Sequence, residues 1–309
     1  MRFGRAVLMT VQRFLSTLSS WVPLKVRTTL RGRRSSPSWF ANAIHSALNQ
    51  IAAERYPVLP CGGALKGFRM RVDWKMHRAF AYGSWEPEVV EVIQEYVKPG
   101  MTVLDIGAQS GYFSLLLSKI VGPSGKVIAF EPLPANFRVL EENVRLNGRT
   151  NISVRQEAVG EHSGEMSFEF PSNEPTLIAG PLLDGDSQGI FDVKGISLDD
   201  MFAANHVQVD FIKMDVEGAE VDVLRGAVKL LEFSHPDMLI ELHNMEKQTG
   251  VHPAVVIVES MGYEIRWLSE IASTAHTFAR WVNKSAVLGA TPPSGSFRDA
   301  NDGRLEPAT

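Results

Sequence analysis

The segment from Val103 to Phe113 (Val-Leu-Asp-Ile-Gly-Ala-Gln-Ser-Gly-Tyr-Phe) constrains the fold more than any other part of the chain. An apolar run ends at an acidic residue, two glycines enclose a short turn, and an apolar helical pattern follows. This order predicts the strand, turn and helix that open a nucleotide-binding βαβ unit. Because Gly107 and Gly111 lack a Cβ atom, the backbone of the turn can approach a ligand closely.

A second apolar run, from Val127 to Phe130, ends at Glu131, where such folds place an acid that accepts hydrogen bonds from ribose hydroxyls. Dinucleotide sites have a glycine where this chain has Asp105. A carboxylate at that position would repel the phosphates of a dinucleotide, so Asp105 favours a cationic ligand. The pattern Asp-x-Gly-x-x-x-Gly resembles motif I of the class I S-adenosylmethionine (SAM) methyltransferases, whose cofactor carries a sulfonium and an amino acid in place of phosphates.

Composition bounds the class of protein. The 309 residues suffice for one large α/β domain with extensions. The single cysteine, Cys61, excludes an intramolecular disulfide framework and a cysteine-cluster metal site, and it agrees with a reducing, cytoplasmic compartment. Eight Lys and Arg precede residue 35, whereas the remaining 23 are outnumbered by 35 Asp and Glu. The part of the chain after residue 34 is therefore acidic and would repel the phosphates of a nucleic acid, so we expect no nucleic-acid partner.

The basic residues 1–34 have apolar side chains at helical spacing, and Arg13 interrupts the only long apolar run. Three interpretations stay open: a helix that lies on an anionic membrane surface, an organelle transit peptide, or a frayed arm. We predict a basic arm and linker at 1–38, a helical lead-in at 39–99, a methyltransferase domain at 100–290 and a disordered tail at 291–309. The lead-in should cap the sheet and wall the cofactor pocket. The sequence specifies no oligomeric state.

Further apolar runs complete a sheet. We expect strands at 152–154, 210–215, 237–242, 263–268, 278–282 and 286–288, with helical patterns between the earlier ones and after residue 216. Residues 171–195 have no periodicity and predict a long irregular loop. The whole pattern predicts an α/β fold: a Rossmann-like, doubly wound, mostly parallel seven-stranded sheet with a helical N-terminal extension.

The second half of the chain sharpens the resemblance. Phe130-Glu131-Pro132-x-Pro134-x-Asn136, the helix with Asn143 and Asn147, and Lys213-Met-Asp-Val-Glu-Gly-Ala-Glu220 resemble the FkbM family of SAM-dependent methyltransferases. Members typically have Gly-Ala-Asn at the first turn, where this chain has Gln109 as the third residue. The resemblance implies O-methylation of a hydroxyl on a sugar, glycolipid or polyketide-like acceptor.

These patterns nominate the site residues. We expect SAM to be bound by Asp105, Gly107, Gln109, Gly111, Glu131, Glu157 and Ala158. Catalytic side chains should follow the fourth and fifth strands, because strand ends meet at one edge of the sheet: Lys213, Asp215, Glu217, Glu241 and His243.

Three roles stay open for this second group. Asp215, Glu217, Glu241 and His243 could gather Mg²⁺, with Asp215 and Glu241 as its first ligands. Alternatively, Asp215 or His243 could act as a base, or Asp215, Glu217 and Glu220 could merely cap a helix. The other seven histidines are predicted to be ordinary residues.

Competing functions can be separated by motif. An NAD-dependent oxidoreductase should have the glycine triplet and a Tyr-x-x-x-Lys pair, and this chain has neither. Many N-methyltransferases carry an Asn/Asp-Pro-Pro-aromatic box where this chain has Asp215-Val-Glu-Gly. A non-catalytic binding protein on the same fold is the third alternative, and Gln109 is its only support.

Overall fold

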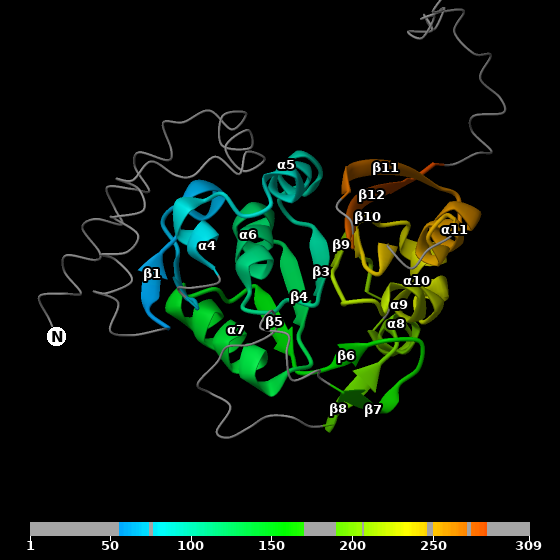
Figure 1. Cartoon of the computed structure of the whole chain (residues 1–309), viewed down its shortest axis with the longest axis horizontal. Helices are drawn as coiled ribbons and strands as arrows, with labels where there is room; N and C mark the ends of the chain where they lie inside the picture. The colour runs from blue at the N-terminus through cyan, green and yellow to red at the C-terminus, as the bar shows by residue number, and fades with distance from the viewer. Residues whose placement is uncertain are drawn as a thin grey trace, which may run out of the picture.

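The computed structural model of the chain describes residues 56–73, 77–169, 190–205, 207–245, 250–270 and 273–282 (Figure 1). The predicted arm at 1–34, the helical pattern before residue 56, the strand at 286–288 and the tail from residue 291 lie outside these ranges. No helix within the described ranges is long and apolar enough to cross a membrane.

A seven-stranded sheet in the order β11-β12-β10-β9-β3-β4-β5 forms the centre of the molecule. Its strands are β3 (Thr102–Ile106), β4 (Lys126–Phe130), β5 (Ile152–Arg155), β9 (Phe211–Met214), β10 (Asp237–Leu242), β11 (Tyr263–Glu270) and β12 (Ala275–Trp281). The strands from β5 to β10 pair in parallel, and β12 runs antiparallel to both its neighbours. The predicted doubly wound, mostly parallel sheet is therefore confirmed.

Helices cover both faces of the sheet, since successive strand residues are apolar and point to opposite sides. Val103 and Phe211 belong to one buried cluster, whereas Leu104 and Ile212 belong to the other. Figure 1 shows α5 (Pro87–Tyr96), α6 (Tyr112–Val121) and α7 (Pro134–Leu146) on one side, and α8 (Leu198–Asn205), α9 (Glu220–Arg225), α10 (Val228–Ser234) and α11 (Pro253–Ser260) on the other.

Two segments differ from the prediction. The helix expected from residue 216 is divided into α9 and α10, because Gly226 lies so close to the Gly160 carbonyl that a Cβ would be 2.1 Å from its oxygen. The loop expected at 171–195 ends in a strand, β8 (Ile190–Ile196). It pairs with β6 (Ala158–Val159) and β7 (Gly164–Glu169) in a separate three-stranded sheet.

The lead-in contains a hairpin that docks on α7. Its strands are β1 (Val58–Pro60) and β2 (Arg69–Arg71). The short helix η1 (Gly63–Leu65) connects them, and the helix α4 (Arg78–Tyr82) follows β2. The amides of Asn143 and Asn147 each exchange two hydrogen bonds with the backbone of Arg71 and Arg69. Two side chains one helical turn apart on α7 thus provide hydrogen-bond partners for the backbone N–H and C=O groups of two alternate residues on the edge of β2. These bonds fix the lead-in against the sheet domain.

Candidate active site

The candidate site lies at the carboxyl ends of β3 and β9, where the strand order reverses and open α/β sheets bind ligands. Gly107 follows β3 with a φ of 79°, and a Cβ built on it would lie 1.7 Å from the carbonyl oxygen of Asp215, which follows β9. Hydrogen bonds hold both turns, from Gly107 N to Phe130 O and from Asp215 N to Ile106 O. Only glycine fits this crossing of two backbones.

Glu131 is a buried acid at the end of β4. Its carboxylate accepts hydrogen bonds from the backbone N–H of Gln109 at 2.8 Å and of Leu133 at 2.9 Å. Burial raises the pKa of Glu131 to about 7. Gln109 has a φ of 49°, a left-handed conformation that Asn adopts far more readily than Gln does. This conformation explains why Asn is the typical residue at this position of the family that the chain resembles.

A largely apolar cavity of about 130 Å³ opens beside Glu131. Among the predicted cofactor residues it is lined by Gly107, Gln109, Glu131, Glu157 and Ala158. Ile106, Phe130, Leu133 and Val216 supply apolar lining. Glu157 is also held by ion pairs with Arg155 and Lys194.

The structure does not bring Asp105 or Gly111 to this lining. Asp105 is fully buried and accepts a hydrogen bond from the Ser114 hydroxyl at 2.5 Å. Gly111 begins α6 with a φ of 89°, and a Cβ there would lie 2.6 Å from Leu140 Cδ1. Both residues therefore pack against α6 and α7, on the side of the turn that does not line the cavity.

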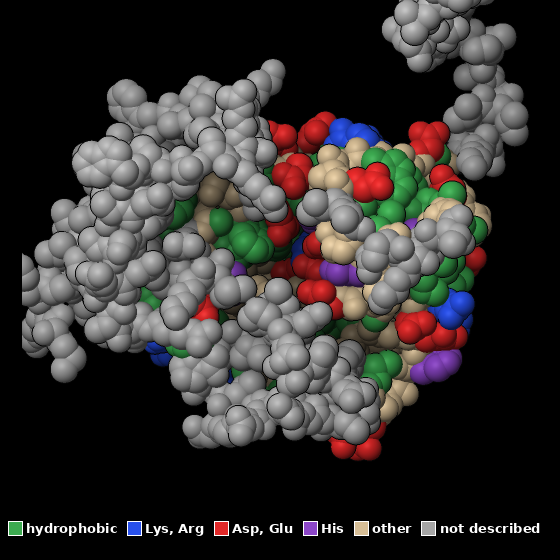
Figure 2. All heavy atoms as spheres, in the orientation of Figure 1, with side chains coloured by type: hydrophobic (Ala, Val, Ile, Leu, Met, Phe, Trp, Pro, Cys, Tyr) green, Lys and Arg blue, Asp and Glu red, His purple; other side chains and the backbone are tan. Residues whose placement is uncertain are grey.

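A second, acidic cavity of about 250 Å³ adjoins the first, and the two share Gly107, Gln109, Asp215 and Glu217. Its walls combine aromatic side chains with charged ones: Phe80, Trp85, Tyr112 and Phe113 with Glu86, Lys213, Asp215, Glu217 and Glu241. Figure 2 shows acidic side chains gathered in a hollow at the centre of this face, with histidine beside them. The lead-in, expected beside the cofactor, contributes Trp85 and Glu86 to this acidic cavity.

Lys213 is buried, and its ammonium lies 3.2 Å from the Asp215 carboxylate. Although burial opposes the charge, Asp215 and Asp105 raise the pKa of Lys213. The ammonium also lies 5.1 Å from the centre of the Phe113 ring. Lys213 is therefore a fixed positive charge and cannot accept a proton.

His243 is surrounded by carboxylates. Its Nδ1 lies 2.8 Å from Glu220, and its Nε2 lies 3.3 Å from Glu217, 3.8 Å from Asp215 and 3.9 Å from Glu241. Burial opposes the charged imidazole, but the hydrogen bond to Glu220, with Asp215 and Glu217 nearby, raises the pKa of His243 to about 9.

Helix capping does not explain these acids. The N-cap of α9 is Ala219, and no side chain caps that helix. Glu217 precedes it in a left-handed conformation with a φ of 54°. Glu220 is in the first turn of α9, where a carboxylate complements the helix dipole, but it accepts from Gly218 N and holds His243.

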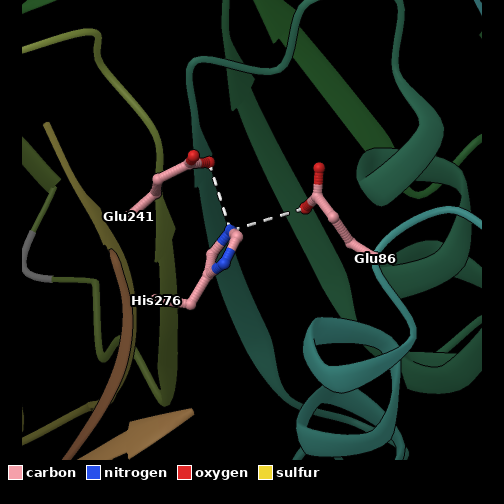
Figure 3. A group of neighbouring side chains, drawn as sticks. All are labelled: Glu86, Glu241 and His276. Atoms are coloured by element: carbon pink, nitrogen blue, oxygen red, sulfur yellow. Dashed lines mark ion pairs between the residues drawn. The ribbon is translucent and has the colours of Figure 1, made fainter. Parts of the chain in front are cut away.

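Two candidate functional residues, His276 and Glu86, are absent from the site residues predicted from the sequence. His276 on β12 lies 3.2 Å from Glu241 and 3.7 Å from Glu86, which precedes α5 (Figure 3). The reading of His276 as an ordinary residue therefore missed a cluster at the site. A cross-strand pairing of Glu241 with His276 brings them together, and that register is not visible in the local pattern.

The glycine turn, the buried acid after β4 and the adjoining cavities define the class of protein: a SAM-dependent methyltransferase of Rossmann-like fold. The family model described as the methyltransferase FkbM domain matches residues 105–265, just over half of the chain. The chain belongs to the FkbM methyltransferase family.

The chain is also similar to individual proteins. The chain is 26% identical to methyltransferase 1 of Beauveria bassiana over 53% of its own length and 72% of the relative's. It is 30% identical to the hexuronic acid methyltransferase AglP of Haloferax volcanii over 54% of its own length and 64% of the relative's, slightly under two thirds. The crystal structure of methyltransferase FkbM from Methylobacillus flagellatus is 18% identical, with a TM-score of 0.40 over 65% of this chain and 52% of that one.

Proposed function

We propose that this enzyme transfers the methyl group of SAM to a hydroxyl of a sugar, glycolipid or polyketide-like acceptor. The observation that carries the proposal is the junction of the two cavities at Gly107, Gln109, Asp215 and Glu217. Methyl transfer needs in-line approach of an oxygen to the sulfonium, so much of the acceleration comes from positioning. Cofactor in the apolar cavity and acceptor in the acidic cavity would meet at this junction.

Asp215 is the base in this proposal, because it lines both cavities and its side chain is partly exposed. Lys213 is a positioning residue that holds one carboxylate oxygen of Asp215 at 3.2 Å. With a pKa of about 9, His243 carries a proton at neutral pH and fits a hydrogen-bond donor better than a base. Glu217, 3.3 Å from His243, completes the acceptor side of the site.

The lining of the acidic cavity favours an uncharged acceptor with several hydroxyls. Four carboxylates, Glu86, Asp215, Glu217 and Glu241, can accept from hydroxyl groups there, whereas Lys213 is the one Lys or Arg in the described lining. The aromatic side chains offer flat apolar surface. The Haloferax relative is named for a hexuronic acid, whose carboxylate would meet like charge in this cavity.

The predicted magnesium site is a variant of the same proposal. Ligand atoms of Asp215, Glu241 and His243 lie within 4.8 Å of one another. His243 is engaged by Glu217 and Glu220, so Asp215 and Glu241 are the oxygen donors that would hold the ion. Bound there, Mg²⁺ would polarise the acceptor hydroxyl and favour loss of its proton.

The test combines calorimetry with transfer of labelled methyl from SAM, with NAD as the control ligand. The acceptors are methyl hexosides, the matching hexuronides and amino-sugar glycosides. We expect SAM to bind and NAD not to bind, with label on a neutral hydroxyl acceptor. Asp215→Asn should bind SAM normally and lose about 10²–10⁴-fold in transfer rate. Asp222→Asn, at an exposed position on α9, is the matched control and should keep full activity.

Several outcomes would count against the proposal. Label on an amine alone would favour the N-methyltransferase alternative, and SAM binding with no transfer to any acceptor would favour the binding protein. Full activity of Asp215→Asn would remove its role as base. Activity that EDTA abolishes and Mg²⁺ restores would replace direct base catalysis with the magnesium variant.

A further inference from the structure

We propose that Glu86, Glu241 and His276 form a binding site for a transition-metal cation of the Zn²⁺ or Mn²⁺ type. Figure 3 shows the two carboxylates directed toward the imidazole from two sides. The His276 Nε2 atom lies 3.2 Å from Glu241 Oε2 and 3.7 Å from Glu86 Oε2. One ligand atom from each residue can be chosen so that all lie within 4.8 Å of one another.

The imidazole carries the strongest evidence. The side chain of His276 is 8% exposed, and its buried Nε2 atom, 3.2 Å from Glu241 Oε2, does not have the geometry of a hydrogen bond to any group in the described part of the chain. The other ring nitrogen, Nδ1, lies 2.9 Å from the Ser269 hydroxyl. That contact fixes the ring so that Nε2 faces the two carboxylates. Metal-bound histidines are commonly held in this way by a partner on their second nitrogen.

The donor set decides the class of cation. One imidazole nitrogen and two carboxylate oxygens suit Zn²⁺ or Mn²⁺, whereas Mg²⁺ prefers oxygen ligands and retained waters. Three protein ligands leave a coordination position open. Glu86 and Glu241 both line the acidic cavity, so that position would face its interior.

A metal at this site would also offset the conformational free energy that the backbone of Glu86 costs. Glu86 has a φ of 35°, a left-handed conformation that costs a non-glycine residue about 1–2 kcal/mol. A bound metal would offset the charges of the two carboxylates, and it would tie the turn before α5 to β10 and β12.

The proposal does not rest on methyl transfer. Glu86 and His276 are separate from the group of Asp215, Glu241 and His243, and Glu241 is the shared member. The two metal hypotheses therefore differ in their ligands. Glu86 and His276 are needed for this site, and Asp215 is needed for the magnesium variant.

The experiment measures binding of Zn²⁺ and of Mn²⁺ to the chelator-treated full chain, by calorimetry and by the electron paramagnetic resonance signal of Mn²⁺. We expect one equivalent to bind. His276→Gln and Glu86→Gln should each weaken binding at least about 100-fold, since even partners behind the ligands contribute about 10–100-fold. Ser269→Ala should weaken it about 10-fold.

Matched variants locate the metal. His162→Gln, at a histidine side chain 84% exposed, and His243→Gln should both leave metal affinity unchanged. SAM binding, which needs none of the three proposed ligands, reports that each variant is folded. The absence of binding at millimolar metal would overturn the proposal and identify His276 as a protonated partner of the two glutamates. Binding that His243→Gln abolishes and His276→Gln spares would also overturn it.

Discussion

Substitution of Gly107 by alanine tests the crossing of backbones on which the site depends. The added Cβ would lie 1.7 Å from the Asp215 carbonyl oxygen, so one of the two turns must move. The left-handed conformation at Gly107 costs an alanine about 1–2 kcal/mol. Relief of the clash should add about 1–3 kcal/mol. We therefore expect Gly107→Ala to reduce the free energy of unfolding by about 2–5 kcal/mol.

A second glycine separates the two contributions. Gly148 also has a positive φ, 57°, but a Cβ built there meets nothing within 4 Å. Gly148→Ala should therefore lose only the conformational part, about 1–2 kcal/mol. Urea unfolding of the wild type and both variants gives the three free energies on one scale.

Cofactor binding gives the second readout. Because Gly107 and Asp215 line both cavities, displacement of either turn should remove SAM binding from Gly107→Ala, whereas Gly148→Ala should bind SAM normally. Equal destabilisation by the two substitutions would refute the steric argument. Normal SAM affinity of Gly107→Ala would show that the crossing does not shape the cofactor cavity.

Three further predictions concern the cofactor turn and the lead-in. Glu131→Gln should weaken SAM binding about 10–100-fold, since hydrogen bonds to charged groups contribute about 1.5–3 kcal/mol. Because the pKa of Glu131 is raised to about 7, its charge is lost as the pH falls below 7, and wild-type affinity in calorimetry should be lower at pH 6 than at pH 8. A pH dependence that persists in Glu131→Gln would assign it to another group. Gln109→Asn should raise the free energy of unfolding by up to about 1 kcal/mol, because Asn tolerates the φ of 49°, and a lower value in urea unfolding would contradict the conformational explanation. Asn143→Ala should cost about 2–4 kcal/mol in the same assay, because it removes the buried hydrogen bonds of Asn143 to the Ser110 carbonyl and to the Arg71 backbone, and a loss no larger than that of a substitution at an exposed site would refute this account.

Local spacing was enough to predict the sheet and to select five residues that line the apolar cavity. The strand, the glycine turn and the acid after the next strand follow one another within 29 residues of the chain, from 103 to 131, so their arrangement is set by the βαβ unit itself. The same pattern could not show that Asp105 and Gly111 face away from the cavity. That depends on Ser114 and Leu140, which pack behind the turn.

Long-range contacts limited the rest of the prediction. Glu86 and His276 are 190 residues apart, and they meet because the turn before α5 lies against β12. The division of α9 from α10 depends on the close approach of Gly160 to Gly226. Strand β8 was missed because its partner β7 lies before a long separating segment. Pairings of this kind have no signature at short range.

The acidic wall at the junction of the cavities has a consequence for turnover. Methyl transfer converts the sulfonium of SAM into the neutral thioether of S-adenosylhomocysteine, so the cofactor loses one positive charge while bound. Asp215 and Glu217, which line both cavities, attract the substrate form and lose that attraction after reaction. We therefore expect the wall that draws in the cofactor to favour release of the spent product, and product inhibition to be weak in this enzyme.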